Sequence, residues 1–385
     1  MLDCIAPRGE NGAYRYRRNK NGGIAMKKIL FVASEGVPFI KTGGLADVVG
    51  SLPKCIDKEY YDVRVILPKY TCMKQEWKDK LVFKDNFYMD FNWRNVYVGI
   101  LEAEYDGVTY YFIDNEGYFG GFRPYGDDVL YEIEKYAFFS KAALSALPMI
   151  GFRPDLIHCH DWQTGLIPVY LKERFQGGDF YRGIKTVMTI HNLKFQGKWN
   201  IKDVQNITGL SDYFFTPDKL EFKKDANLLK GGIVYADAIT TVSDTYAEEI
   251  KTDFYGEGLN GLLNARSGDL RGIVNGIDYD SFNPENDPYI AKTYNAANFR
   301  KEKVKNKRAL QEELGLEVID LNFVKTYPYL KKEMLMIGFH ATVKKAEFVF
   351  SQEVDTAKWF AFAEALGNIR EGSIAWQLVK EVIEK

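Results

Sequence analysis

Short, continuous apolar runs recur along most of the chain, and each ends in a glycine, aspartate, serine or histidine. Runs of this length are typical of strands that are buried on both faces of a sheet. Stretches with helical periodicity lie between several of the runs. Strands are predicted at residues 27–34, 62–68, 155–160, 185–192, 237–243 and 271–277, and helices at 45–57, 131–147, 165–175 and 244–251.

Alternating strands and helices indicate right-handed crossovers between parallel strands. The predicted fold is therefore α/β, with a Rossmann-like, doubly wound and mostly parallel sheet formed by residues 26–299. Ligands of such sheets bind beyond the carboxyl ends of the strands. Unusual polar residues follow the runs at these ends, in the sequences EGVPFIKTGG, HDWQTG, HNLKFQG and SDTYAEE.

Three regions depart from this pattern. Residues 81–125 are rich in tyrosine, phenylalanine and glycine, and predict a hairpin meander inserted into the sheet domain. A charged stretch predicts a linking helix at 300–316. Residues 317–385 are expected to form a short, irregular tail. Within this tail the pattern predicts a strand at 335–339 and amphipathic helices at 357–366 and 374–383.

The charge balance limits the choice of partners. The 51 Lys and Arg residues nearly cancel the 53 Asp and Glu residues, so no long-range field gathers polyanions, and binding of nucleic acid or anionic membranes is not expected as the main function. No run reaches the ~18 apolar residues of a membrane span. Residues 1–25 are basic and lack the apolar core of a signal peptide, so they are interpreted as an N-terminal extension.

Four cysteines are present, and none has a partner at a paired spacing. This spacing argues against a disulfide framework and against a cysteine-based zinc site. A reducing, cytoplasmic location fits best. The cysteines are Cys4, Cys55, Cys72 and Cys159.

The segment Lys41-Thr42-Gly43-Gly44 follows the first predicted strand and precedes a predicted helix. Backbone amides at a helix N-terminus attract anions, and glycines let a phosphate approach the backbone closely. Lys41 adds a positive charge suited to a diphosphate. The alternative is a plain turn with an exposed lysine, because the segment is neither a Walker A loop nor a GxGxxG motif.

A second group of polar residues ends the strand at 155–160. Alternation along a strand places His158 and His160 on one face. A metal site would need a third ligand, which the spacing does not offer, and packing of a core histidine is the alternative. The Asp161 carboxylate could accept hydrogen bonds from sugar hydroxyls, with Trp162 as an apolar wall for the sugar ring.

His191 and Asn192 close the next strand at the same predicted edge, and a buried histidine capped by Asn192 is again the alternative. The polar stretch at 194–198 could contact a substrate. A serine hydrolase would carry a Gly-x-Ser-x-Gly elbow, and a dehydrogenase would carry a dinucleotide fingerprint. Both motifs are absent from the sequence.

Taken together, these motifs resemble the bacterial glycogen synthase and starch synthase family. The resemblance extends from Lys27 to about Leu316, and the order of the motifs makes it specific. The matching segments are KTGGLADVVGSLP, DLIHCHDWQTGLIPVYL, TIHNLKFQG, LLKGGIVYADAITTVSDTYAEEI, YGEGLNGLL and GIVNGIDYDSFNP.

The resemblance implies the N-terminal half of a GT-B fold and the transfer of glucose from ADP-glucose to an α-1,4-glucan, with retention of configuration. It implies no metal and no cofactor, since ADP-glucose is a substrate. Asp161 and His191 are expected beside the transferred glucose, and Gln163 stands where relatives commonly carry histidine. The substrate-binding residues implied are Lys41, Gly43, Gly44, Tyr118, His160, Trp162, Asn192 and Gln196.

The resemblance ends before the family's second domain, which supplies an arginine, a lysine and a Glu-x7-Glu segment to the donor. Nothing after Leu316 matches these motifs, and Glu364 and Glu371 have the wrong spacing. The chain alone is therefore expected to be weakly active or inactive. Two alternatives are a non-catalytic glucan-binding or regulatory module, and one half of a split synthase whose second chain supplies the donor domain.

Overall fold

The computed structural model describes residues 26–279, 282–314, 318–329 and 334–343, together with residues 364 and 379. The chain divides into two compact units, Met1–Gly276 and Ile277–Lys385, and each is described by itself.

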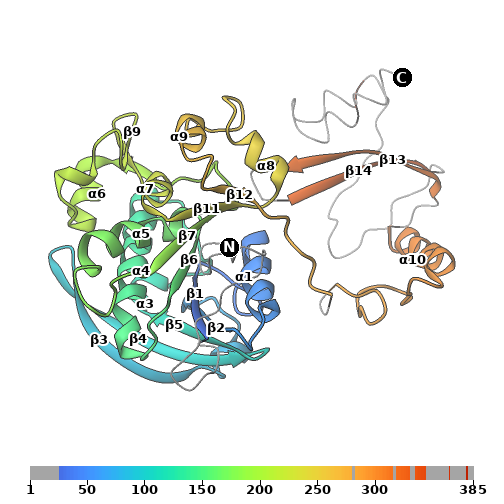
Figure 1. Cartoon of the computed structure of the whole chain (residues 1–385). Coiled ribbons are helices and arrows are strands. Elements are labelled where there is room, and N and C mark those ends of the chain that lie inside the picture. Colours follow the sequence, from blue (N-terminus) through green and yellow to red (C-terminus); the bar gives the residue numbers. More distant parts are fainter. Residues whose placement is uncertain are drawn as a thin grey trace, which may run out of the picture. The chain divides into compact units, whose positions relative to one another are not determined.

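The first unit is built on a nine-stranded sheet in the order β12-β11-β7-β6-β1-β2-β5-β4-β3 (Figure 1). Neighbouring strands from β12 to β5 are parallel, whereas β4 and β3 continue the sheet as antiparallel strands. The strands are β1 (Lys27–Val32), β2 (Tyr61–Pro68), β3 (Val82–Phe91), β4 (Arg94–Tyr105), β5 (Val108–Asp114), β6 (Leu156–His160), β7 (Lys185–Ile190), β11 (Ala238–Thr241) and β12 (Leu270–Gly272).

Helices connect most of these strands, and a small sheet of β8 (Lys198–Asn200), β10 (Asp225–Asn227) and β9 (Glu221–Phe222) lies between β7 and β11 in the sequence. A 3₁₀ turn (Trp162–Thr164), α5 and a π-helical turn (Leu171–Phe175) follow one another after β6. The α-helices are α1 (Gly44–Cys55), α2 (Gln75–Lys78), α3 (Glu116–Phe119), α4 (Val129–Met149), α5 (Leu166–Tyr170), α6 (Ile201–Thr208), α7 (Leu228–Tyr235), α8 (Asp244–Glu249) and α9 (Asn260–Ala265).

The sheet reverses its winding direction between β1 and β6. From β1 the chain adds β2 and β5 on one side, and it then returns to add β6, β7, β11 and β12 on the other. In doubly wound sheets, the loops on either side of such a reversal diverge, and ligands bind outside the carboxyl ends of the two strands. The predicted Rossmann-like, doubly wound sheet is confirmed.

Alternate residues of β1 belong to two separate cores. Leu30 and Val32 pack in a cluster that includes residues of α4 and α5, whereas Ile29 and Phe31 pack in a cluster that includes residues of α1. Figure 1 shows these helices on opposite faces of the sheet. Burial on both faces explains why β1 is a continuous apolar run in the sequence.

The predicted C-terminal boundary of the last strand was wrong. The prediction was 271–277, but β12 stops at Gly272 because its register partner β11 ends at Thr241. Apolar residues beyond this point are exposed, and Val274 has 72% of its surface accessible. An apolar run does not become a strand where no neighbouring strand is left to pair with it.

The hairpin meander predicted at 81–125 is confirmed, but its interpretation as an insertion is wrong. Arg64 to Pro68 of β2 pair in parallel with Thr109 to Ile113, so β5 is a strand of the main sheet. The hairpin of β3 and β4 extends the same sheet through β5. Residues of β5 are buried on both faces, which ties this strand to the core.

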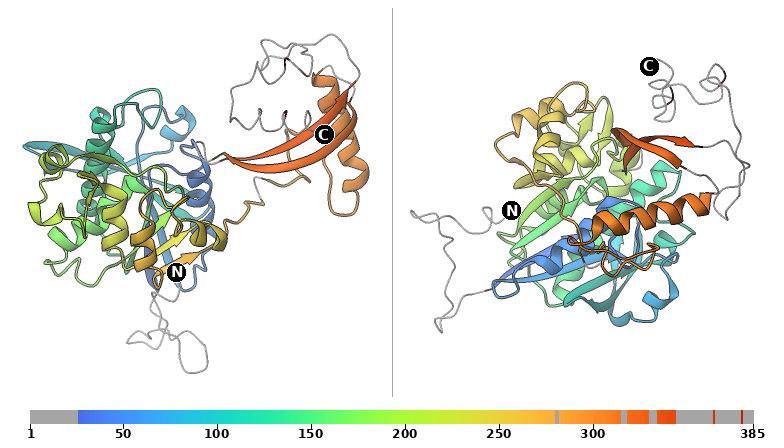
Figure 2. Two further views of the ribbon diagram at one scale, coloured as in Figure 1. Left: turned by 90° about the horizontal axis from the view of Figure 1, so that it is seen from above. Right: turned by 90° about the vertical axis from the view of Figure 1, so that its right-hand side faces the viewer.

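The second unit contains α10 (Phe299–Leu314), which confirms the predicted helix, and a hairpin of β13 (Val318–Tyr329) and β14 (Met334–Val343). Figure 2 shows the two strands as a long twisted ribbon. The strand predicted at 335–339 lies within β14, whereas β13 was not predicted. The helices predicted at 357–366 and 374–383 lie outside the described residues, except for residues 364 and 379, which are helical.

Candidate active site

The loop after β1 leads from the sheet to the N-terminus of α1. A bridge between Gly36 and Ile40 folds the loop back on itself. Gly43 is the N-cap of α1 and provides no side-chain cap for the first-turn amides, so the helix N-terminus keeps donors suited to an anion. Lys41 is exposed beside them, and its ammonium lies 2.7 Å from Oδ1 of Asp47.

Asp161 follows β6 in an unusual backbone conformation, with φ 55° and ψ −174°. Non-glycine residues rarely occupy this region, where the strain costs on the order of 1–3 kcal/mol. The side chain is buried, and its Oδ1 accepts hydrogen bonds from the backbone amides of His191 (2.7 Å) and Asn192 (3.4 Å). These contacts join the ends of β6 and β7 through one carboxylate.

Three histidines lie next to one another, two in β6 and one directly after β7. The rings of His158 and His160 are 4.2 Å apart, which confirms that they share one face of β6. Nδ1 of His160 lies 2.9 Å from Nε2 of His191. Burial lowers the pKa of His191 to about 4 and the pKa of His158 to about 3, and it holds the pKa of His160 well below its usual range. All three rings are therefore neutral near pH 7.

Two of the predicted substrate contacts are engaged with protein. The amide of Gln196 donates to the carbonyl oxygens of Leu193 (2.9 Å) and Glu257 (3.3 Å) and accepts from Nδ2 of Asn227 (2.7 Å). Asn192 accepts a hydrogen bond from the amide of Lys194 (3.0 Å) and orders the turn after β7. The substrate roles of Gln196 and Asn192 stay predictions.

Trp162 packs against protein on at least two sides. Its ring centroid is 5.3 Å from that of Tyr136, in an edge-to-face arrangement. A Cβ added to Gly197, which has φ 61°, would come within 2.3 Å of the indole. Glycine is therefore needed here both for its backbone conformation and for the close approach of the ring. Trp162 joins the loops that follow β6 and β7, and its role as a sugar wall stays a prediction.

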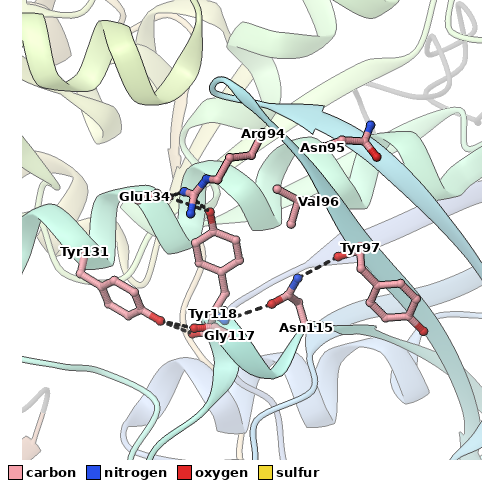
Figure 3. Close-up of a pocket in the computed structure, with 9 residues that line it drawn as sticks. All are labelled: Arg94, Asn95, Val96, Tyr97, Asn115, Gly117, Tyr118, Tyr131 and Glu134. Atoms are coloured by element: carbon pink, nitrogen blue, oxygen red, sulfur yellow. Dashed lines mark hydrogen bonds and ion pairs between the residues drawn. The ribbon is translucent and has the colours of Figure 1, made fainter.

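Tyr118 lies in a different hollow, with a volume of about 710 Å³, lined by residues of β4, α3 and α4 (Figure 3). Its hydroxyl donates to Oε1 of Glu134 (2.7 Å) and accepts from Nη2 of Arg94 (3.1 Å). The contacts of its side chain named here are therefore with residues of β4 and α4. The contacts at the ends of β6 and β7, by contrast, join His160, Asp161, His191 and Asn192 to one another.

Sequence reasoning missed Glu35 as part of this site. The side chain is 3% exposed and accepts hydrogen bonds from Thr42, including one from the hydroxyl at 3.0 Å. A charged residue directly after a buried strand was the available signal, because such a group is rarely buried without a partner. Gln163, by contrast, was singled out from the sequence; it is 9% exposed, and its Oε1 has no hydrogen-bond partner within the described part of the chain.

Within the part of the chain that the structure describes, no group of three or more His, Cys, Asp or Glu side chains could hold a metal ion. No described helix is both long enough and apolar enough to cross a membrane.

The doubly wound sheet, the uncapped helix N-terminus and the buried carboxylate at the reversal point define an α/β domain of the kind that binds ligands at the carboxyl ends of its strands. Residues 28–265 match the family model described as the starch synthase catalytic domain. The chain belongs to this family, as the sequence motifs predicted.

Two glycogen synthases show the degree of similarity. The chain is 68% identical over 291 residues to the "Glycogen synthase" of Lachnospira eligens, covering 76% of this chain and 61% of the relative. It is 65% identical over 299 residues to that of Lachnoclostridium phytofermentans, covering 78% and 62%. The chain thus spans about three fifths of the length of these relatives.

Among solved structures, the chain is similar to the catalytic domain of Starch Synthase IV from Arabidopsis thaliana bound to ADP and acarbose. The TM-score is 0.67 at 32% identity, and the match covers 77% of this chain and 61% of that chain. This similarity supports the assignment of the first unit to one half of a GT-B fold.

Proposed function

We propose that the chain is the acceptor-side part of a glycogen synthase, which transfers glucose from ADP-glucose to the non-reducing end of an α-1,4-glucan with retention. Two named relatives are glycogen synthases, and the similar plant structure was solved with ADP and acarbose. The proposal rests on one observation: the N-terminus of α1 and the Asp161 carboxylate both lie beyond the carboxyl ends of β1 and β6.

The residues have distinct roles in this proposal. Amides at the first turn of α1 and the Lys41 ammonium bind the donor diphosphate. Asp161 and His191 lie beside the transferred glucose, where a carboxylate and a neutral ring form hydrogen bonds with sugar hydroxyls. Cleavage of the C–O bond builds negative charge on the departing diphosphate, and preorganised cations and amides act on that charge in the transition state.

Lys41 is the cation that the described loop after β1 contributes to the diphosphate. Each further preorganised group that a complete site would add is worth roughly 3 kcal/mol, or about a hundredfold in rate. The chain by itself is therefore proposed to transfer glucose weakly, and a second chain that supplies a donor-side domain is proposed to raise the rate. No cofactor beyond the nucleotide sugar is proposed.

A cytoplasmic location is part of the proposal. Cys55, Cys72 and Cys159 are free thiols in the described part of the chain, which agrees with a reducing compartment.

The test is incorporation of labelled glucose from ADP-glucose into glycogen by the purified chain, with and without the C-terminal domain of the Lachnospira eligens relative. We expect slow incorporation that rises when this domain is added and falls at least tenfold in Lys41→Ala. Lys202→Ala is the matched control, because Lys202 is exposed on α6. Equal rates for Lys41→Ala and wild type would contradict the assignment of the loop.

A second candidate function is a glucan-binding module without transfer activity, and the hollow in Figure 3 favours it. Tyr97, Tyr118 and Tyr131 supply rings, while Asn115 and Glu134 supply polar atoms, a combination typical of sugar sites. Co-sedimentation with glycogen, without incorporation under any of the conditions above, would support this module. Tyr131→Ala would then reduce the co-sedimented fraction, because Tyr131 is the most exposed of these three rings.

A further inference from the structure

Glu35 is a buried carboxylate at the end of β1, and the proposed function gives it no part. Only 3% of the residue is accessible. Its oxygens accept hydrogen bonds from the amide of Thr42, from the hydroxyl of Thr42 at 3.0 Å and from the hydroxyl of Tyr125 at 3.2 Å. A charge that is buried to this degree requires such donors.

The contacts with Thr42 fix the end of the loop that delivers the chain to α1. The loop is closed at its other end by paired hydrogen bonds between Gly36 and Ile40, at 3.1 Å each. The amide of Val37 also donates to the carbonyl of Ala46 in α1 at 3.0 Å. The loop is thus held at three points, and Glu35 holds the one adjacent to Lys41 and Gly43.

Tyr125 connects the carboxylate to the rest of the fold. Its hydroxyl lies 2.8 Å from the hydroxyl of Ser34, and burial raises its pKa, so it remains a protonated donor to Glu35. The preceding residue, Pro124, is held by α4, since its carbonyl accepts a hydrogen bond from Nζ of Lys135 at 2.7 Å. The position of Glu35 is therefore set by a helix of the core and not by the loop alone.

The carboxylate also determines which donors remain for a ligand. Because Glu35 occupies the Thr42 amide, the donors offered to an anion are those that follow, at the first turn of α1. The Glu35 carboxylate does not attract a diphosphate, because both are negatively charged. Any contribution of Glu35 to binding must therefore come from the geometry that it gives the loop. Preorganised donors improve affinity because the ordering cost is already met before binding.

We propose that Glu35 is a positioning residue, which holds Thr42 so that Lys41 and the amides of α1 are preset for the diphosphate of the donor. This proposal rests on the proposed function for its ligand. The geometry that it assigns to the loop is independent of any ligand.

The test compares Glu35→Ala with Glu35→Gln. Glutamine has the same shape and can accept from the Thr42 amide while its NH₂ group donates to the hydroxyls of Thr42 and Tyr125, since the Tyr125 hydroxyl can donate to Ser34 instead. We expect Glu35→Ala to weaken ADP-glucose binding about tenfold by calorimetry, and Glu35→Gln to stay within threefold of wild type. Glu104→Ala, at an exposed position on β4, is the matched control.

Thr42 offers a variant that does not disturb the core, because this residue is exposed. Thr42→Val loses only the hydroxyl donor and should weaken binding about threefold, whereas Thr42→Ser keeps both donors and should bind as wild type. Amide hydrogen exchange over residues 39–46, measured without ligand, should rise at least tenfold in Glu35→Ala and little in Glu35→Gln.

The outcomes separate the two proposals. Faster exchange at 39–46 in Glu35→Ala supports the positioning role even if the wild-type chain binds no ADP-glucose, a result that would reject the donor assignment alone. Unchanged exchange in Glu35→Ala would overturn the positioning role. It would also be overturned if Glu35→Gln were as damaging as Glu35→Ala, because the carboxylate would then act through its charge.

Discussion

At the residue scale, the site combines a strained aspartate with neutral histidines. Asp161 keeps its unfavourable φ of 55° because its carboxylate accepts hydrogen bonds from two backbone amides directly after β7. His160 and His191 are buried and share a hydrogen bond, so neither ring carries charge near neutral pH. The site thus presents carboxylate oxygen and neutral ring nitrogen atoms, which can form hydrogen bonds with the hydroxyls of a sugar.

The buried histidines predict how stability depends on pH. The folded-state pKa is about 4 for His191 and about 3 for His158, and both rings titrate near 6.5 when exposed. Between pH 6.5 and 5 the unfolded chain therefore binds protons that the folded chain does not, and the free energy of unfolding falls as the pH is lowered. The expected slope for each ring rises from about 0.7 kcal/mol per pH unit at pH 6.5, where half of the unfolded rings are protonated, to about 1.4 at pH 5.

Urea unfolding at several pH values from 5 to 6.5 measures this slope, in a range where most carboxylates stay ionised. His158→Gln should reduce it by the contribution of one ring, which is about 1.4 kcal/mol per pH unit near pH 5. An identical slope in wild type and variant would show that His158 is protonated in the folded state.

Substitution of Gly44 is expected to weaken binding without lowering stability. A Cβ at this position would meet no atom within 4 Å, so Gly44→Ala should fold normally and gain up to about 1 kcal/mol from helix propensity. The added methyl group would stand where a phosphate approaches the helix N-terminus, and ADP-glucose affinity should fall about tenfold in calorimetry. Gly261→Ala in α9 is the control, since its Cβ is equally unobstructed.

At the element scale, the fold was largely predictable because buried parallel strands and amphipathic helices leave distinct periodicities. The polar residues after β1, β6 and β7 were correctly expected to share one edge of the sheet. The separation of Tyr118 was not predictable, because a position after β5 does not show that the side chain faces β4 and α4. The end of β12 at Gly272 was not predicted, because the length of a strand depends on a pairing partner that is distant in the sequence.

Because α5 and α7 lie in close contact, we expect substitution of one glycine between them to destabilise the fold. A Cβ on Gly165 would lie 2.3 Å from the carbonyl oxygen of Leu228, a clash with backbone that a rotamer change cannot relieve. Gly165→Ala should lower the free energy of unfolding by about 3 kcal/mol in urea titrations. Gly177→Ala, whose Cβ would meet nothing within 4 Å, should change it by less than about 1 kcal/mol. Similar midpoints for the two variants would contradict the close packing of these helices.

At the scale of the whole molecule, the proposed function requires a nucleotide sugar to bind between β1 and β6, where the winding direction of the sheet reverses. The family assignment supports this place, and the geometry supplies its anion donors and its buried carboxylate. The chain spans about three fifths of its named relatives, so binding is a more direct test than turnover.

The decisive measurement is hydrogen exchange of the full chain, followed by mass spectrometry, with and without saturating ADP-glucose. We expect protection at residues 42–47 and 161–165, with no change at residues 94–97 in the hollow around Tyr118. Protection confined to residues 94–97, or none at any segment despite binding seen by calorimetry, would contradict the proposed function.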